Sequence, residues 1–500
     1  MATTLTPSET TAAQPASGTP ASHGKDLRTF LDQLVSTYPD QLKVVDEEVD
    51  PVFEAAAIVH KMKNDANFPG YPAVLFRNIK GSKIPLILNL HGTFERVALS
   101  IDSDIKGMVP EYGKREGSPL PWKEVTSEEA PVHEVVQTGD EIDITQLPLL
   151  IHQEFDSGKY ITSAAAITVD PDSGRENAGI FRHQLQGPRQ IGFMSNPAHH
   201  TSYILRARRE RKEPLQVALA IGHHPAMLMG AVSKLAGIGG ELEVMGGLLN
   251  EPLEVVKAKT VDMFVPARAE IIIEGVVDTD PEKVQNEGPF GEYPLYYTRI
   301  GPMPWMRITA VTMRRNPIYV DVFNAHDEHL VLGALPRMGS IYRRVRESMP
   351  TVTAVNLPLM GIRSSLFIAM KKRVDGEPKI AASAAFAVDP ILKHIWIVDD
   401  DIDVFDNDQV LWAMTTRFQA DRDLIVMPNF LGGHLNPVTY GYHREEKGPM
   451  ETKMILDCTK PAPPATFPPK CEVPKDIVET VDPASVVKPL EPGTSFSSQS

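Results

Sequence analysis

Residues 287–292 read Glu-Gly-Pro-Phe-Gly-Glu, and they interrupt a series of strand-like segments with a stretch that cannot be helical. Pro289 lacks an amide donor and the glycines permit turn geometry, so this stretch is a loop. The loop presents two carboxylates, Glu287 and Glu292. Paired carboxylates on a rigid loop suit general acid–base chemistry, because their neighbours can hold one ionised and the other protonated. A solvated turn between two strands is the alternative interpretation of the same residues.

The sequence around this loop predicts a domain rich in strands. Between residues 131 and 315, short apolar runs alternate with Gly, Pro and charged turns. Closely spaced strands of this kind are typical of a β-barrel or a strongly curved sheet. The expected strands lie at 163–169, 190–194, 215–221, 253–257, 269–275 and 305–313.

The preceding residues, 26–130, predict an α+β unit. Leu27, Phe30 and Leu34 recur at helical spacing, and Pro51 opens a second helix with one apolar face. Strands are expected at 42–45, 73–76 and 84–90. The first 25 residues, rich in Ala, Thr, Ser and Pro, predict a disordered tail.

After residue 316 the pattern changes to alternating strands and helices. This alternation predicts an α/β domain with a partly parallel sheet over residues 316–460. The expected strands lie at 318–322 and 394–398, and the expected helices at 340–347 and 410–418. Residues 461–500 are rich in Pro, Ser and charge and predict an extended arm or a tail.

Composition excludes several classes of function. The 500 residues carry a net charge of −15 at pH 7, which argues against nucleic-acid or anionic-membrane binding. The basic run from Arg206 to Lys212 is interrupted by Glu210, so a solvated helix face is expected there. No apolar run reaches the roughly 20 residues that cross a bilayer. The two cysteines, Cys458 and Cys471, form no CxxC pair, so a reducing, cytoplasmic location is expected.

A dispersed polar set could hold a divalent metal. Asn177 and His200 precede Glu241 in the chain, and all three follow expected strands or turns. Asparagine oxygen, imidazole nitrogen and carboxylate oxygen together suit Mn²⁺ or Mg²⁺ better than a structural zinc. Each residue also has an ordinary alternative, such as a surface or capping role for His200.

Other polar clusters receive structural interpretations. His223 and His224 stand beside Pro225 at a strand end, and we expect them to be structural. The run from His326 to His329 predicts a polar loop in preference to a metal site. The sequence contains no P-loop, HExxH, GxGxxG or Gly-x-Ser-x-Gly motif, which removes the enzyme classes that depend on them.

Taken together, the motifs resemble the UbiD family of decarboxylases in both order and spacing. The resemblance runs from about residue 26 to 460, and its late segments look most like the branch of protocatechuate and other aromatic-acid decarboxylases. Five motifs carry it: Asn177-x4-Arg182, His200, Glu241-x4-Gly246, the loop from Glu287 to Glu292, and the acidic run Asp399–Val404 before Leu411-Trp412-Ala413.

This resemblance implies a fold and a cofactor. The expected fold is a split β-barrel flavin-binding domain between the N-terminal α+β unit and a C-terminal α/β oligomerisation domain. The cofactor is prenylated FMN, supplied by a separate flavin prenyltransferase and held through Mn²⁺ or Mg²⁺ and K⁺. The implied metal ligands are Asn177, His200 and Glu241. The implied flavin-lining residues are Gly179, Ile180, Phe181, Arg182, His199 and these three ligands.

The resemblance also implies an activity: reversible, non-oxidative decarboxylation of an aromatic or α,β-unsaturated acid through a covalent adduct between the substrate and prenylated FMN. Arg182 presents a fork that matches a carboxylate, and it is expected to orient the substrate and pair with Glu287. Glu292 is expected to give a proton to the carbon that loses CO₂. The family forms homo-oligomers, with dimers and hexamers both known.

Several positions depart from the family pattern. Gly179 replaces a polar residue, His199 replaces a glutamine, and Ala387 stands where some members have a phosphate-binding lysine. Tyr293 and two further tyrosines follow Glu292, which favours an aromatic substrate or packing of the loop. Two other functions remain open: a flavoprotein that binds unmodified FMN, and a non-catalytic subunit of a decarboxylase complex.

Overall fold

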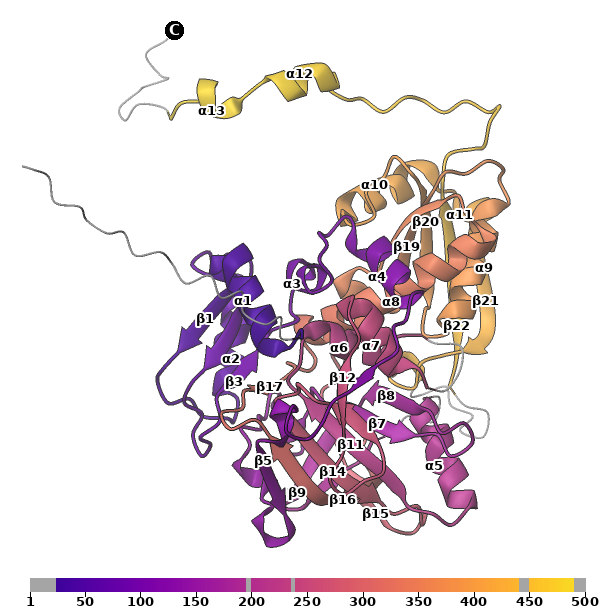
Figure 1. Cartoon of the computed structure of the whole chain (residues 1–500). Coiled ribbons are helices and arrows are strands. Elements are labelled where there is room, and N and C mark those ends of the chain that lie inside the picture. Colours follow the sequence, from indigo (N-terminus) through magenta and orange to yellow (C-terminus); the bar gives the residue numbers. More distant parts are fainter. Residues whose placement is uncertain (1–23, 195–198, 235–238, 440–448, 490–500) are drawn as a thin grey trace, which may run out of the picture.

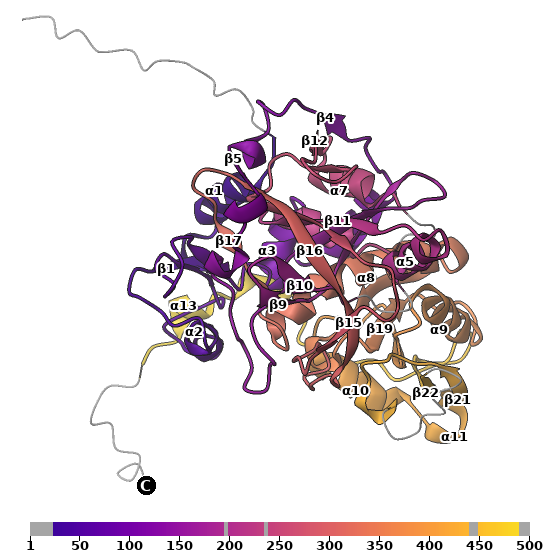
Figure 2. The same ribbon diagram turned by 90° about the horizontal axis from the view of Figure 1, so that it is seen from below.

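The computed structural model describes residues 24–194, 199–234, 239–439 and 449–489. Most of the disordered tail expected for residues 1–25 lies outside them. A mixed α/β chain forms three successive units with helices packed between them, and an arm extends from the last unit (Figure 1). The N-terminal and C-terminal units lie at opposite ends of the central sheet (Figure 2).

The N-terminal unit is a small sheet covered by helices. Its strand order is β1-β2-β3-β17, with parallel outer pairs and an antiparallel pair at the centre. The helix expected after Pro51 begins three residues later, because Phe53 takes a positive φ of 68° and turns the chain first. The elements are α1 Leu27–Thr37, β1 Leu42–Val45, α2 Glu54–Met62, β2 Ala73–Phe76, β3 Leu86–Leu88 and β17 Tyr319–Val320.

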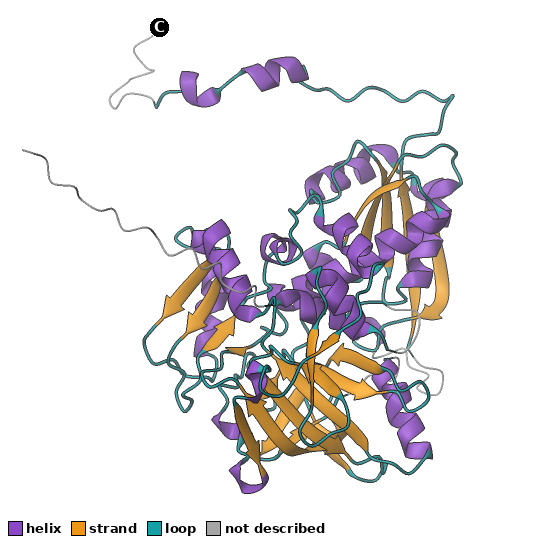
Figure 3. Cartoon of the chain, viewed as in Figure 1, coloured by secondary structure: helices purple, strands orange, loops and turns teal. Residues whose placement is uncertain are grey.

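The central unit confirms the curved sheet. Ten strands of the described chain form one antiparallel sheet that curls into a half-barrel (Figure 3). Its main order is β6-β9-β10-β16-β14-β11-β7-β8, with β5 and β15 also paired to β16. The strands are β5 Val135–Thr138, β6 Tyr160–Ile161, β7 Ala165–Val169, β8 Glu176–Ile180, β9 His183–Gly187, β10 Gln190–Gly192, β11 Leu215–Ile221, β14 Ile271–Val277, β15 Val284–Glu287 and β16 Gly301–Met313.

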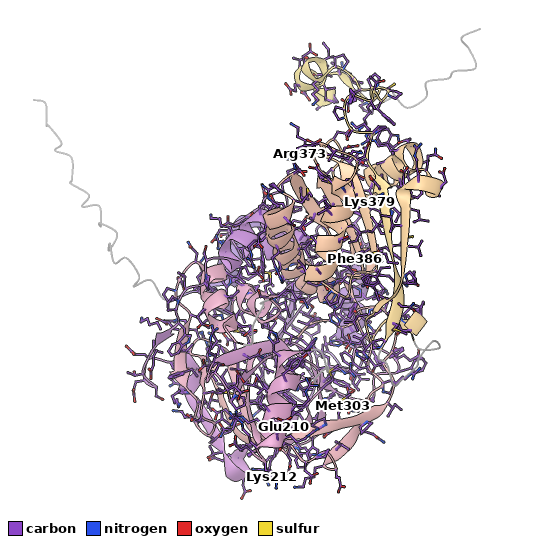
Figure 4. The ribbon with its side chains drawn as sticks, turned by 90° about the vertical axis from the view of Figure 1, so that its right-hand side faces the viewer. Glu210, Lys212, Met303, Arg373, Lys379 and Phe386 are labelled. Atoms are coloured by element: carbon purple, nitrogen blue, oxygen red, sulfur yellow. The ribbon has the colours of Figure 1, made fainter. Side chains whose placement is uncertain are left out.

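Helices close one side of this half-barrel, and a small three-stranded sheet lies beside them. The basic run at the end of α5 is exposed as expected, with Glu210 and Lys212 on the outer surface (Figure 4). The elements are α3 Phe94–Leu99, α4 Met108–Glu116, β4 Lys123–Glu124, α5 His200–Glu210, α6 Pro225–Ala231, α7 Glu241–Leu249, β12 Glu254–Lys257 and β13 Phe264–Pro266.

The C-terminal unit is the expected mixed sheet, in the order β18-β19-β20-β22-β21. Strands β19, β20 and β22 run parallel, and the outer pairs are antiparallel. The strand expected at 318–322 is not part of it, because β17 pairs with β3. The elements are α8 Asp327–Ser348, β18 Val352–Asn356, β19 Ser365–Met370, α9 Glu377–Val388, β20 His394–Asp399, α10 Asn407–Arg417, α11 Ala420–Asp423, β21 Leu424–Leu431 and β22 Met450–Cys458.

Beyond the C-terminal unit, the chain continues as an arm that points away from the body (Figure 1). It carries two short helices, α12 Lys475–Thr480 and α13 Pro483–Val486. Residues 463–489 are exposed throughout. No helix in the described ranges is long and apolar enough to cross a membrane.

Candidate active site

The loop from Glu287 to Glu292 is buried, so its interpretation as a solvated turn is wrong. Glu287 ends β15 and is 1% exposed, and Glu292 is 8% exposed. Gly288 has a φ of +90°, a conformation that glycine adopts without strain. Gly291 is held from both sides: its N–H donates to Asp156 and its carbonyl accepts from Asn324. The sequence of this loop therefore fixes the direction of both carboxylates.

Arg182 comes from a link that joins the two edges of the half-barrel. Strands β8 and β9 are consecutive in the chain but stand near opposite ends of the sheet order. The two residues between them, Phe181 and Arg182, therefore cross the open side of the curled sheet. This position brings Arg182 to the loop that carries both glutamates.

Arg182 binds both carboxylates at once. Its Nε and Nη2 atoms donate to the two oxygens of Glu287, and its Nη1 atom donates to Oε1 of Glu292, all at 2.8 Å. Burial opposes the charge of the guanidinium, but the bonds and charges of Glu287 and Glu292 outweigh burial and raise the pKa of Arg182 above its usual value. The guanidinium also lies 5.1 Å from the centre of the Phe290 ring. Sequence predicted the pair with Glu287; the second pair, with Glu292, is an additional finding.

A cavity of about 350 Å³ opens beside this trio, between the half-barrel and the C-terminal unit. This is the size of a small-molecule site. Of the residues expected to line a flavin, Ile180, Phe181, Arg182 and His199 line this cavity. Glu292 and Tyr293 line it as well, so the expected acid and the expected flavin surface face the same space.

The three expected metal ligands lie near one another, but none of them lines the cavity; His200 directly follows the cavity-lining His199. His200 and Glu241 are the first residues of α5 and α7, and Asn177 is in the edge strand β8. Nδ1 of His200 is 3.9 Å from Oε1 of Glu241. The backbone N–H of Ala178, next to Asn177, donates to Oε2 of Glu241 at 3.4 Å. Asn177 and Glu241 are only 2% and 3% exposed.

The donor chemistry of these residues fits a divalent cation. The Nδ2 atom of Asn177 donates to Thr201, whereas its Oδ1 atom is buried without a hydrogen-bond partner in the described chain. A buried oxygen of this kind costs free energy unless something binds it. The described residues contain no group of three His, Cys, Asp or Glu side chains that could hold a metal ion, and this set has only two because its third member is an asparagine. Two oxygens and one imidazole nitrogen suit Mn²⁺ or Mg²⁺.

Gly179 and Phe181 explain one departure from the family pattern. A Cβ atom at Gly179 would lie 2.8 Å from the Phe181 ring, so the ring occupies the space that a side chain would need. The Phe181 ring in turn lies 5.5 Å from the His199 ring. These two rings form an aromatic wall of the cavity beside positions 179 and 199, where the sequence departs from the family pattern.

One expectation for neighbouring residues is corrected. The run from His326 to His329 is not a loop: His326 caps α8, and the following residues form its first turn. Glu328 is fully buried and accepts from three backbone N–H groups, those of Asn89, His91 and Phe323.

The tyrosines after Glu292 do not act as a group. Tyr293 lines the cavity, whereas Tyr296 is 61% exposed. The Tyr297 hydroxyl accepts from the N–H of Phe155 and so holds the loop to its neighbour. Only Tyr293 can contact a bound ligand, which weakens the sequence argument for an aromatic substrate.

Sequence reasoning missed five basic residues of the cavity. Lys234, His329, Arg337, Arg363 and His434 all line it. They come from separate segments after α6, within α8, before β19 and after β21, and no local motif connects them. Gly333 is the one sequence signal, because a Cβ there would lie 1.8 Å from Nη1 of Arg363. A glycine one helical turn before Arg337 thus leaves room for the second guanidinium.

Comparison with known proteins places this chain in a family. Three UbiD models match consecutive parts of the chain: the 3-octaprenyl-4-hydroxybenzoate carboxy-lyase N-terminal domain over residues 37–116, its Rift-related domain over 123–326 and its C-terminal domain over 330–458.

Two curated relatives match nearly the whole chain. The anhydromevalonate phosphate decarboxylase of Methanothermobacter thermautotrophicus is 31% identical over 436 residues, which cover 87% of this chain and 97% of the relative. The phenolic acid decarboxylase of Sedimentibacter hydroxybenzoicus is 32% identical over 461 residues, which cover 89% and 93%.

Solved structures agree. The UbiD-class enzyme HmfF from Pelotomaculum thermopropionicum, in complex with FMN, has a TM-score of 0.83 and 36% identity, covering 92% of this chain and 100% of that one. An evolved dimeric form of the same enzyme, in complex with prFMN, has a TM-score of 0.82 and 35% identity, covering 93% and 100%.

Proposed function

This chain belongs to the UbiD family of carboxy-lyases, and on that premise we propose that it decarboxylates an aromatic or α,β-unsaturated carboxylic acid, reversibly, with prenylated FMN as cofactor. One observation carries the proposal. A single arginine is bound by two buried glutamates at the wall of a cavity. Electron transfer by a plain flavoprotein needs neither a carboxylate fork nor a proton donor.

The structure fits the cofactor in two places. Ile180, Phe181 and His199 would line its ring system, and Asn177, His200 and Glu241 would hold the metal that binds its phosphate. When bound, prenylated FMN supplies the electron sink that the departing CO₂ requires, since the carbon it leaves cannot hold the electron pair alone. The covalent adduct implied by the resemblance stays a prediction.

Arg182 would bind the substrate through the one fork position that Glu287 does not use. Glu287 occupies Nε and Nη2, whereas Nη1 is shared with Glu292. An incoming carboxylate would compete with Glu292 for Nη1 and displace it. Glu292 would then face a second negative charge in a water-poor site, and both conditions favour its protonated form.

The displaced, protonated Glu292 is the proton donor in this proposal. The bond between the substrate carbon and its carboxyl group breaks, CO₂ leaves, and the proton of Glu292 replaces it on that carbon. Glu292 ends the step as a carboxylate and returns to Nη1 of Arg182, which is the arrangement seen here. Glu287 keeps the guanidinium in place throughout, because it holds Arg182 with two bonds of its own.

Other features of the family are proposed in the same way. They comprise Mn²⁺ or Mg²⁺ with K⁺, a flavin prenyltransferase as supplier, a homo-oligomer built through the C-terminal unit, and a cytoplasmic location. The domain boundaries at residues 130/131 and 315/316 also stay a prediction. A role as a non-catalytic subunit is less well supported, because such a subunit would have no need of Arg182, Glu287 and Glu292 together.

The deciding experiment is co-expression with a flavin prenyltransferase, in buffer containing Mn²⁺ and K⁺. The mass and absorbance of the bound cofactor are measured first, and CO₂ release from a panel of aromatic and α,β-unsaturated acids second. We expect prenylated FMN and CO₂ release from at least one acid. Bound FMN without the prenyl group, and no CO₂ from any acid, would instead favour the plain flavoprotein or the complex subunit.

A further inference from the structure

One wall of the cavity carries positive charge that the catalytic trio does not use. It consists of Lys234, Arg337 and Arg363, which we name the cation wall. Arg337 is buried and pairs with the buried Asp389. Neither Lys234 nor Arg363 has an ion pair or hydrogen bond to a side chain in the described ranges, and Nε of Arg363 is buried without a partner there. In the described ranges, Asp389 is thus the one carboxylate that pairs with any of these three cations, and Glu292 acts on Arg363 through its charge alone.

Arg363 is fixed in position, and the backbone that holds it there is strained. Its guanidinium lies 4.2 Å from the centre of the Tyr293 ring and rests against Gly333. Ile362 and Arg363 both have positive φ values, 44° and 57°, which are unfavourable for residues with a Cβ atom. Strain of this kind persists where the surrounding structure requires it, often at ligand sites. Burial and the charge of Arg337 lower the pKa of Arg363 to about 10.

The cation wall lies near the proton donor. Tyr293 directly follows Glu292, so the ring on which Arg363 stacks belongs to the residue next to the acid. His329 lies within electrostatic range of both Arg363 and Arg182, and burial together with Arg363 lowers the pKa of His329 well below its ordinary value. Its Nδ1 atom accepts from the N–H of Ala325, which leaves the proton of the neutral ring on Nε2. His329 therefore offers the cavity a hydrogen-bond donor and no positive charge.

We propose that the cation wall binds a second acidic group of the substrate, so that this enzyme acts on acids with one anionic group at Arg182 and another at Arg363. The inference rests on the proposed function and names its substrate class. A substrate with a single carboxylate would neutralise neither Arg363 nor Lys234. A second carboxylate can accept from the guanidinium of Arg363 in the bidentate geometry that arginine favours.

The phosphate of the cofactor is the other anion that these cations could bind. Under the proposed function, the orphaned oxygen of Asn177 and the pair of His200 and Glu241 would hold the metal of the cofactor on β8, α5 and α7. Arg363 instead stacks on the residue that follows Glu292, where the substrate must lie if Glu292 is to protonate it. This placement favours the substrate, and the experiment below separates the two sources.

Binding is measured by calorimetry with the cofactor-loaded Glu292→Gln variant, which holds ligands without turning them over. The probes are terephthalate, its monomethyl ester and benzoate, with thiophene-2,5-dicarboxylate, its monomethyl ester and thiophene-2-carboxylate as a five-membered series. Each half-ester keeps the size of the diacid but lacks its second charge. We expect a diacid in at least one series to bind roughly 10- to 100-fold tighter than its half-ester, the range of a charged buried hydrogen bond.

Replacing Arg363 with Met in the same protein should reduce that preference to about twofold or less, because the charged partner is gone. The matched control is Arg373→Met, an exposed arginine of the C-terminal unit whose one ion-pair partner in the described part of the chain is Glu377 and which lies at the outer surface (Figure 4). It should keep the full preference. Gly333→Ala, which displaces the Arg363 guanidinium without removing it, should weaken the preference as well and serves if Arg363→Met does not fold.

Four results would overturn the inference. Equal affinity for diacid and half-ester in both series would show that the cation wall does not bind a second acidic group of the substrate. Loss of bound flavin from Arg363→Met, measured by absorbance after denaturation, would assign the cation wall to the cofactor phosphate. If single-carboxylate acids bind and release CO₂ without any preference for diacids, only this inference fails. If no acid of any kind binds or releases CO₂, the proposed function fails with it.

Discussion

Arg182 gives Glu287 two parallel hydrogen bonds, from Nε to Oε1 and from Nη2 to Oε2, each 2.8 Å long. The pair is buried and joins the crossing between β8 and β9 to the end of β15. A lysine has the same charge but no fork, so it cannot reproduce both bonds or keep a third nitrogen for Glu292. The geometry of this pair therefore sets the direction in which Nη1 points, and with it the orientation of a carboxylate that binds there.

Replacing Arg182 with Lys should lower kcat/KM by roughly 100-fold or more, because small misplacements of a positioning group have effects of that size. Cofactor content should change little, since the expected metal ligands are untouched. Steady-state CO₂ release and flavin per chain are the measurements. Arg189→Lys is the control: Arg189 is exposed and pairs with an exposed Asp140. A fully active Arg182→Lys enzyme would mean that the fork does not position the substrate.

Replacing Glu292 with Gln should lower kcat by roughly 10²- to 10⁴-fold, the contribution of a general acid. The amide oxygen of glutamine can still accept from Nη1 of Arg182, so folding and flavin binding should survive. Turnover is measured together with flavin absorbance. The control is Glu282→Gln, which changes an exposed glutamate between β14 and β15. This variant should behave as the unmodified protein. Retained turnover in Glu292→Gln would assign the proton to another group.

Much of the fold was predictable because turn residues mark the ends of the strands clearly. Strands β1, β2 and β11 match the expected ranges at both ends. Helix α8 was harder: only residues 340–347 were expected, whereas it runs from Asp327 to Ser348 with Pro336 inside it. Gly333, Pro336 and Gly339 are poor helix formers, so local propensity hid a helix that tertiary packing stabilises. The pairing of β17 with β3 is long-range and left no local signal.

The site was predictable only where a motif is continuous or its spacing is characteristic. Glu287 and Glu292 share one loop, and the order of Asn177, Arg182, His200 and Glu241 carried the family resemblance. Lys234, Arg337 and Arg363 meet only because α8 and the segment before β19 pack against the half-barrel. Isolated basic residues are usually solvated, so nothing in their surroundings in the sequence distinguished them. The double role of Nη1 of Arg182 likewise depends on side-chain geometry alone.

Removing one expected metal ligand should release the cofactor. Glu241→Gln keeps the size of the side chain but loses the charge that a divalent cation prefers. We expect bound manganese and bound flavin to fall together, by about 10-fold or more if the loss resembles that of other metal-site changes. Elemental analysis and flavin absorbance give both numbers.

The control for this change lies on the same helix. Glu243 pairs with Arg175 at 3.5 Å and is not an expected ligand, so Glu243→Gln should keep metal and flavin. A chelator should mimic Glu241→Gln in the unmodified protein, and added Mn²⁺ should restore flavin binding. Full flavin content in Glu241→Gln would show that the cofactor is held elsewhere.

The stability of the protein should fall in mild acid, and His183 should account for a measurable part of the loss. His183 is fully buried in β9, where Nδ1 donates to the carbonyl of Gly192 and burial lowers the pKa of the imidazole to about 4. In the unfolded chain the imidazole of His183 has a pKa near 6.5, so it binds a proton at pH values where the folded chain leaves it neutral. The free energy of unfolding therefore decreases as the pH falls from about 6.5 to about 4.

Replacing His183 with Gln tests this contribution, because glutamine can donate to Gly192 but does not titrate. Between near pH 7.5 and near pH 5, the stability of the unmodified protein should drop by about 2 kcal/mol more than that of His183→Gln, given the two pKa values. Urea unfolding at both pH values measures the difference, and since only a difference between two proteins is compared, other titrating groups cancel. An identical pH dependence in the two proteins would mean that His183 takes up its proton at the same pH in the folded and the unfolded chain, so that burial beside Phe193 does not lower its pKa.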